Sequence, residues 1–136
     1  MAFIKRDKLE MITSPRLALA HVTVALGAAC EYHDLEGYEE AIRVTAFAAL
    51  DLARYREILG RTETPESDRA LEQCSDHLSK ANAAYVSSDY DAARKALALA
   101  SIHLDRYLQD LGASVADLRE DLLPLITDSG SEQSKH

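Results

Sequence analysis

The chain has 136 residues, of which 47% are hydrophobic and only 6% aromatic, and its formal net charge is −8 at pH 7. This length fits one domain with a single core, and abundant Ala favours closely packed helices over a β-sandwich. The negative charge argues against binding to nucleic acid or to an anionic membrane, because both need a basic surface. No apolar run approaches the roughly 18 residues that a membrane span requires.

The N-terminal part of the chain combines a charged start with a strong helix signal. Charges in residues 1–10 fall where a secretory signal peptide needs an apolar core, so we expect a cytoplasmic protein. In that compartment Cys30 and Cys74 should be free thiols. Ser14 followed by Pro15 predicts the start of a helix. The helix carries two apolar rows, so it should be covered on more than one side.

Four long helices account for most of the chain. Each is marked by apolar residues spaced three and four apart, and Gly60 and Gly112 follow the second and the fourth. Short turns favour antiparallel neighbours, so we expect an all-α, antiparallel four-helix bundle made of two long αα-hairpins. The predicted helices cover residues 15–33, 38–59 and 65–86, and a last one runs from the Ser87–Ser88 turn to residue 111.

The ends of the chain should add little to this bundle. We expect short extra helices at both termini, and Ser114 with Asp117 predicts the start of the C-terminal one. Residues 127–136 are polar, and we expect them to form a disordered tail. The sequence therefore predicts a single all-helical domain over residues 1–126.

The two hairpin tips repeat one pattern, 52 residues apart. Tyr38 is followed by Ala41 and Tyr90 by Ala93, and Ser88 is the predicted N-cap of the last helix with Asp91 in the capping box. This pattern resembles the tetratricopeptide-type helical hairpin, and the resemblance implies a module that binds a protein or peptide. The residues that carry it are Ala29, Tyr32, Tyr38, Ala41 and Ala48 in the first hairpin, and Tyr90, Ala93, Leu97 and Ala100 in the second.

Each cysteine is followed three residues later by a histidine. Residues i and i+3 share a helix face, so Cys30 with His33 and Cys74 with His77 could supply the four ligands of a zinc site. Superposing the two tips, however, places the pairs at heights that differ by roughly 12 Å. The alternative is that both cysteines pack as small apolar residues beside incidental histidines.

A second possible site lies at the start of the first helix. Arg16 and His21 have the Arg-x₄-His spacing found in HEPN-type helical ribonucleases, and the resemblance would imply RNA cleavage. The alternative is that His21 is a partly buried residue bonded to a neighbour. Other catalytic patterns are absent from the sequence, including the Glu-x-x-His motif of di-metal bundles and the Gly-x-Ser-x-Gly elbow.

The function that these observations favour is a non-enzymatic helical interaction module, adaptor or chaperone-like, that binds a protein partner, self-associates and needs no cofactor. Residues 44–50 contain no charge, so the second helix is either central in the bundle or uses a second face as a subunit interface. Its predicted members are Val44, Phe47 and Ile58. The alternatives are a metal-binding bundle that uses the two Cys-x-x-His pairs and a HEPN-like ribonuclease of the toxin type.

Overall fold

A computed structural model describes residues 15–60 and 64–112, and it confirms the predicted all-α bundle of two hairpins. The short terminal helices and the tail over residues 127–136 lie outside the described residues. The predicted bounds agree with the structure except at the end of the first helix, which extends one residue further. The helices are α2 (Pro15–Asp34), α3 (Tyr38–Leu59), α4 (Pro65–Val86) and α5 (Tyr90–Leu111).

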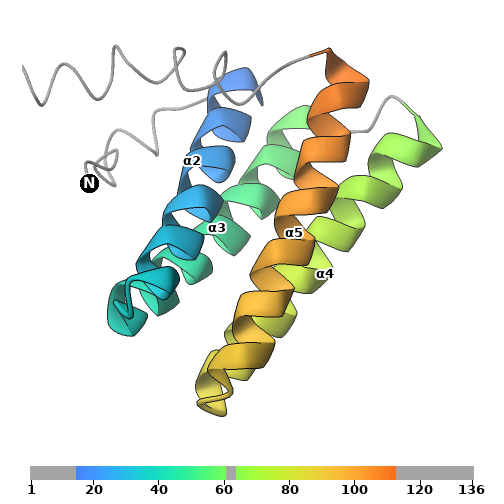
Figure 1. Ribbon diagram of the computed structural model, residues 1–136. Coiled ribbons are helices and arrows are strands. Elements are labelled where there is room, and N and C mark those ends of the chain that lie inside the picture. The colour runs from blue at the N-terminus through green and yellow to red at the C-terminus, as the bar shows by residue number, and fades with distance from the viewer. Residues whose placement is uncertain (1–14, 61–63, 113–136) are drawn as a thin grey trace, which may run out of the picture.

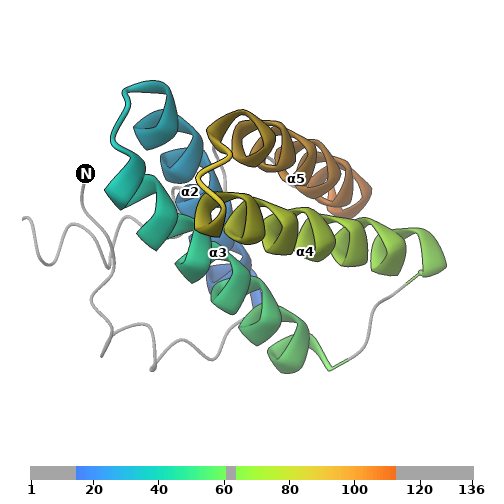
Figure 2. The ribbon, with the colours of Figure 1, turned by 90° about the horizontal axis from the view of Figure 1, so that it is seen from below.

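The four helices form a closed bundle with alternating directions. Helix α2 packs along α3 and α4 packs along α5, and the tips of both hairpins lie at the same end of the molecule (Figure 1). Helix α3 also contacts α4, and α2 contacts α5, so every helix has two neighbours. Figure 2 shows this arrangement from the end at which the tips lie. The two hairpins therefore share one core.

An offset of 52 residues relates one hairpin to the other. Adding 52 to the bounds of α3 gives the bounds of α5, and α2 maps in the same way onto α4 without its first two residues. Identical residues are buried at equivalent core positions, so the second hairpin repeats the packing of the first. These pairs are Ala18 and Ala70, Leu19 and Leu71, Leu26 and Leu78, Ala29 and Ala81, Ala41 and Ala93, Ala48 and Ala100, Leu52 and Leu104, and Tyr55 and Tyr107.

Equivalent residues of the two hairpins meet inside the bundle. The rings of Tyr38 and Tyr90 stack with centroids 4.2 Å apart, and the hydroxyls of Tyr55 and Tyr107 share a hydrogen bond. Because Tyr38 and Tyr55 lie near opposite ends of α3, about 25 Å apart, equivalents meet at both ends of the bundle. The hairpins are thus related by an approximate two-fold rotation about an axis along the bundle.

The turn at each hairpin tip has the same unusual backbone. Glu36 and Ser88 occupy equivalent positions with φ angles of 63° and 57°, the left-handed region. The amide of Gly37 donates to the Tyr32 carbonyl, and that of Asp89 to the Ala84 carbonyl, both at 2.8 Å. Together with the 3.0 Å bonds from Glu36 to His33 and from Ser88 to Tyr85, these contacts form a Schellman motif at both tips.

This turn corrects the predicted N-cap of the last helix. Ser88 was expected to cap it, but the cap is Asp89, whose Oδ1 accepts a 3.2 Å hydrogen bond from the Ala92 amide. Ser88 cannot serve as the cap because its left-handed backbone is used to end α4. The N-cap of α4 is Thr64, whose hydroxyl accepts a 3.0 Å hydrogen bond from the Ser67 amide.

The left-handed residues at the two tips give a direct test of this turn. Glycine adopts positive φ without steric cost, so Glu36→Gly and Ser88→Gly should each raise the free energy of unfolding by about 1 kcal/mol. Ser87→Gly is the matched control, because Ser87 has a φ of −86° and gains nothing from glycine. Urea unfolding curves measure all three variants, and an equal loss of stability in each would contradict the assignment.

Candidate functional site

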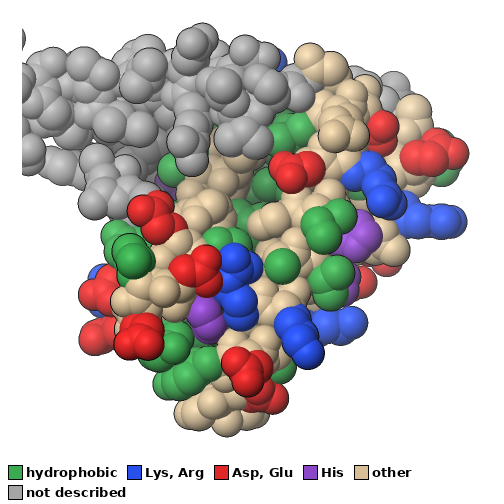
Figure 3. Space-filling view, viewed as in Figure 1, with side chains coloured by type: hydrophobic (Ala, Val, Ile, Leu, Met, Phe, Trp, Pro, Cys, Tyr) green, Lys and Arg blue, Asp and Glu red, His purple; other side chains and the backbone are tan. Residues whose placement is uncertain are grey.

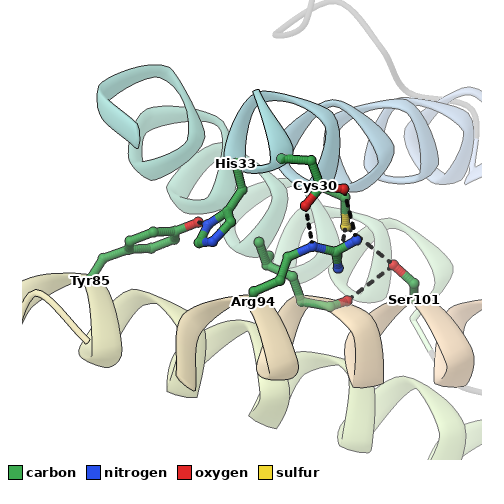
Figure 4. A network of polar contacts seen from close by, with 7 residues as sticks. Cys30, His33, Tyr85, Arg94 and Ser101 are labelled. Atoms are coloured by element: carbon green, nitrogen blue, oxygen red, sulfur yellow. Dashed lines mark hydrogen bonds and ion pairs between the residues drawn. The ribbon is translucent and has the colours of Figure 1, made fainter. Parts of the chain in front are cut away.

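The most connected polar cluster of the described residues joins α2 to α5 near the hairpin tips (Figure 4). Arg94 of α5 donates two hydrogen bonds to the carboxylate of Asp34, from Nε at 2.8 Å and from Nη2 at 3.1 Å. Its Nη1 lies 3.7 Å from the Sγ of Cys30, which in turn lies 3.9 Å from the Ser101 hydroxyl. The cluster thus places a half-buried thiol beside a fixed cation.

The ion pair between Asp34 and Arg94 has favourable two-bond geometry, but both side chains remain partly exposed to solvent. The hydrogen bonds from Arg94 lower the pKa of the Asp34 carboxyl, and the same bonds raise the pKa of Arg94. Bidentate contacts of this kind fix the direction of both side chains. The side chains remain 35% and 56% exposed, so solvent screens the pair. Its main effect is to orient α5 against α2.

A buried aromatic cluster lies beside this ion pair, at the tip end of the core. Nδ1 of His33 and the hydroxyl of Tyr85 are hydrogen bonded at 2.6 Å, and the His33 ring packs edge-on against Tyr38. Burial raises the pKa of Tyr85 to about 12 and lowers the pKa of His33, to which the nearby charge of Arg94 adds. Both groups are therefore held neutral near pH 7, as a tightly packed core requires.

Each hairpin also holds one contact of its own that involves a histidine, and the two contacts differ in kind. In the first, His21 and Asp51 are buried and hydrogen bonded through Nδ1, and Nε2 of His21 has no hydrogen-bond partner among the described residues. In the second, the rings of His77 and His103 stack with centroids 5.2 Å apart. Burial and the neighbouring His103 lower the pKa of His77. Asp51 and His103 are equivalent positions, so the duplication has diverged here.

The two histidines with a lowered pKa predict that acid destabilises the fold. His33 and His77 bind protons less readily when folded than when unfolded, where their pKa is near 6.5. Their contribution to stability is complete above that pH and is lost as the pH falls through the lowered values. Guanidinium unfolding at a series of pH values should show stability declining between pH 7 and pH 5.

The variant His77→Gln checks the cause of this decline. It removes one of the two titrating groups, so the loss of stability on acidification should be smaller than in the wild type. The carboxyl of Asp34 does not interfere, because its pKa lies below the ordinary value of 3.8 and its effect belongs to a lower pH range. A stability that does not change between pH 7 and pH 5 in the wild type would contradict the prediction.

The four predicted metal ligands do not come together in the structure. His33 is bonded to Tyr85, and His77 is stacked on His103. Cys74 is fully buried in the core row of α4, where burial raises the pKa of its thiol to about 12. Within residues 15–60 and 64–112, no group of three or more His, Cys, Asp and Glu side chains could hold a metal ion. The two hairpin tips lie at the same height in the bundle. The two Cys-x-x-His pairs precede their tips by different numbers of residues, so the pairs lie at different heights.

This geometry predicts that chelation leaves the fold unchanged. Because the pairs at Cys30 and Cys74 lie apart, EDTA treatment of protein purified without an affinity tag should not alter its melting temperature. Differential scanning calorimetry measures the midpoint, and elemental analysis of the untreated protein measures bound zinc. Stoichiometric zinc whose removal lowers the midpoint would restore the metal-binding interpretation.

The ribonuclease-like pair is split between surface and core. Arg16 is exposed, whereas His21 is only 5% exposed and engages Asp51. A catalytic histidine must reach the atoms that react, and this imidazole faces the core between α2 and α3. The structure thus agrees with the alternative that His21 is bonded to a buried neighbour.

The predicted interface residues have three different environments. Val44 is 5% exposed and belongs to the core, Ile58 packs against that core, and Phe47 is half-buried. The more exposed apolar residues of α3 are Ile42 and Leu50, at 38% and 57%, and on α5 they are Leu99 and Ile102, at 42% and 52%. These four exposed residues were not predicted from the sequence, although the 52-residue offset relates Leu50 to Ile102.

Comparisons with known proteins identify no relative of this chain. No protein-family model matches the chain, and no curated protein or solved structure shows significant similarity to it. The resemblance to tetratricopeptide hairpins therefore gains no support from these comparisons. None of the described helices combines the length and the apolar character needed to cross a membrane. What the structure defines is a closed four-helix bundle built from a duplicated hairpin.

Proposed function

We propose that the chain is a non-enzymatic interaction module that self-associates through the outer face of α3. The observation that carries this proposal is an exposed row without charge, which we call the α3 row. Its members are Ile42, Ala46, Leu50 and Ala53. These residues are spaced four, four and three apart, so they follow one side of the helix.

The duplication supplies an internal comparison for this row. The equivalent positions on α5 hold Arg94, Ala98, Ile102 and Asp105, so the second copy of the same face carries two charges. Arg94 is bound to Asp34, and Asp105 is exposed. Charged groups are depleted at the centres of protein interfaces because desolvation is costly. The uncharged α3 row is therefore the better surface for a second copy.

An antiparallel pairing of two α3 helices about Ala46 would suit the side chains. Ile42 of one copy would then lie opposite Leu50 of the other, and the small Ala46 side chains would allow the helices to approach closely. Glu39 would lie near Arg54 of the second copy, which brings opposite charges together at the rim. Such a contact is isologous and closes as a dimer.

The test is the variant Leu50→Glu, which places a charge in the centre of the row. Because a two-fold dimer contains the Leu50 contact twice, loss of about 2 kcal/mol at each copy weakens the dimer by about 1,000-fold, so the variant should be monomeric at concentrations where the wild type is dimeric. Ile102→Glu is the matched control, because Ile102 is equivalent and similarly exposed. Sedimentation equilibrium measures all three proteins.

Two results would contradict the proposal. A wild-type protein that stays monomeric at high concentration removes self-association altogether. A dimer that Ile102→Glu also disrupts would mean that α3 of one copy contacts α5 of the next, which is not the closed pairing proposed. Circular dichroism and thermal unfolding must show that both variants retain the bundle.

A further inference from the structure

A row of two basic and two apolar residues lies along the outer face of α5. We call it the α5 stripe, and its members are Lys95, Leu99, Ile102 and Arg106. Their spacing of four, three and four residues keeps them on one face over about 16 Å. All four side chains are exposed, Leu99 and Ile102 by 42% and 52%. Figure 3 shows hydrophobic side chains on this side of the molecule with basic and histidine side chains beside them.

The charges of the α5 stripe oppose those of the whole protein. Lys95 and Arg106 make no ion pair within the described part of the chain. They bracket the apolar pair, whereas the chain as a whole carries a net charge of −8. On α4 beside them, His77 stacks on His103 and lies near Lys80 and Asp76. The exposed carboxylates of Asp91 and Asp110 lie one turn beyond Lys95 and Arg106 on the same helix face, and that of Asp105 lies beside the stripe.

A second copy of the chain does not fit this stripe. Two α5 stripes facing each other in antiparallel register would place Lys95 opposite Arg106, and a parallel register would place each base opposite itself. The equivalent positions on α3 hold Arg43, Phe47, Leu50 and Arg54, so pairing α5 with that face meets the same repulsion. Like charges brought together at an interface oppose binding. A partner with acidic residues opposite Lys95 and Arg106 would complement the stripe.

We propose that the α5 stripe binds an amphipathic helix of a partner protein whose apolar pair is bracketed by acidic residues. The complementary pattern is Glu-x-x-x-Leu-x-x-Leu-x-x-x-Glu, which repeats the spacing of the stripe with opposite charges. Apolar contact with Leu99 and Ile102 supplies the affinity, and the two terminal charges select the partner. The inference rests on the proposal that the chain is an interaction module, but it concerns a different helix from the one proposed for self-association.

The test uses two synthetic helical peptides of about 20 residues with an Ala-based background. One carries the Glu-flanked pattern, and the other carries Lys in place of both Glu residues. Fluorescence anisotropy with labelled peptides should show that the wild type binds the Glu-flanked peptide at least about tenfold more tightly. The preference should shrink as salt is added, because exposed charges are screened.

Charge reversal on the protein gives the decisive comparison. The double variant Lys95→Glu, Arg106→Glu should prefer the Lys-flanked peptide, and a general loss of folding could not produce this exchange. Arg43→Glu is the matched control, since Arg43 is the exposed equivalent of Lys95 on α3, away from the stripe, and the variant should keep the wild-type preference. Ile102→Ser should weaken binding of both peptides by about tenfold, because it removes half of the apolar pair.

Each outcome bears on one proposal at a time. Equal binding of the two peptides, binding to neither at millimolar concentration, or an unchanged preference in the double variant would overturn the α5 proposal. Leu50→Glu should bind the Glu-flanked peptide as the wild type does, whether or not it dimerises. A monomeric wild type that prefers the Glu-flanked peptide would therefore refute self-association and leave the α5 stripe intact.

Discussion

The whole bundle depends on the contact of equivalent tyrosines along its axis. Tyr38 meets Tyr90 at the tip end, and Tyr55 meets Tyr107 at the other. A side chain that packs against its own equivalent fixes both the distance and the rotation between the hairpins. The alanines next to these rings are buried as well, and their small size lets the helices approach closely. The two copies are identical at these axial positions, whereas other buried equivalents differ, as Thr45 and Leu97 do.

The polar features are found where the two halves have diverged. Asp34 and Arg94 form an ion pair between α2 and α5, while the equivalent positions between α4 and α3 hold Val86 and Ile42. Asp51 binds His21 in one hairpin, and its equivalent His103 stacks on His77 in the other. On the outer face, positions that are uncharged on α3 hold Arg94 and Asp105 on α5. This divergence is why we assign the two helices different partners.

Helices and core rows were predictable because their signals are local. Pro15, Thr64, Gly60 and Gly112 mark helix ends in the sequence, and the rows at spacings of three and four identify the residues that are buried. The candidate sites were harder to predict. Arg94 reaches Asp34 across a gap of 60 residues, and no periodicity signals that contact. The N-cap prediction at Ser88 was wrong. The residues around Ser88 fit a capping box, but its left-handed backbone ends α4.

The sequence alone determined four amphipathic helices, the turns between them and the 52-residue repeat. These follow from hydrogen bonding and side-chain spacing within one segment of chain. Only the tertiary structure decided that the hairpins close into a two-fold bundle, that Val44 is buried, and that Leu50, Leu99 and Ile102 are exposed. An amphipathic helix can bury either of two apolar sides, and which side it buries is set by the helices that pack against it.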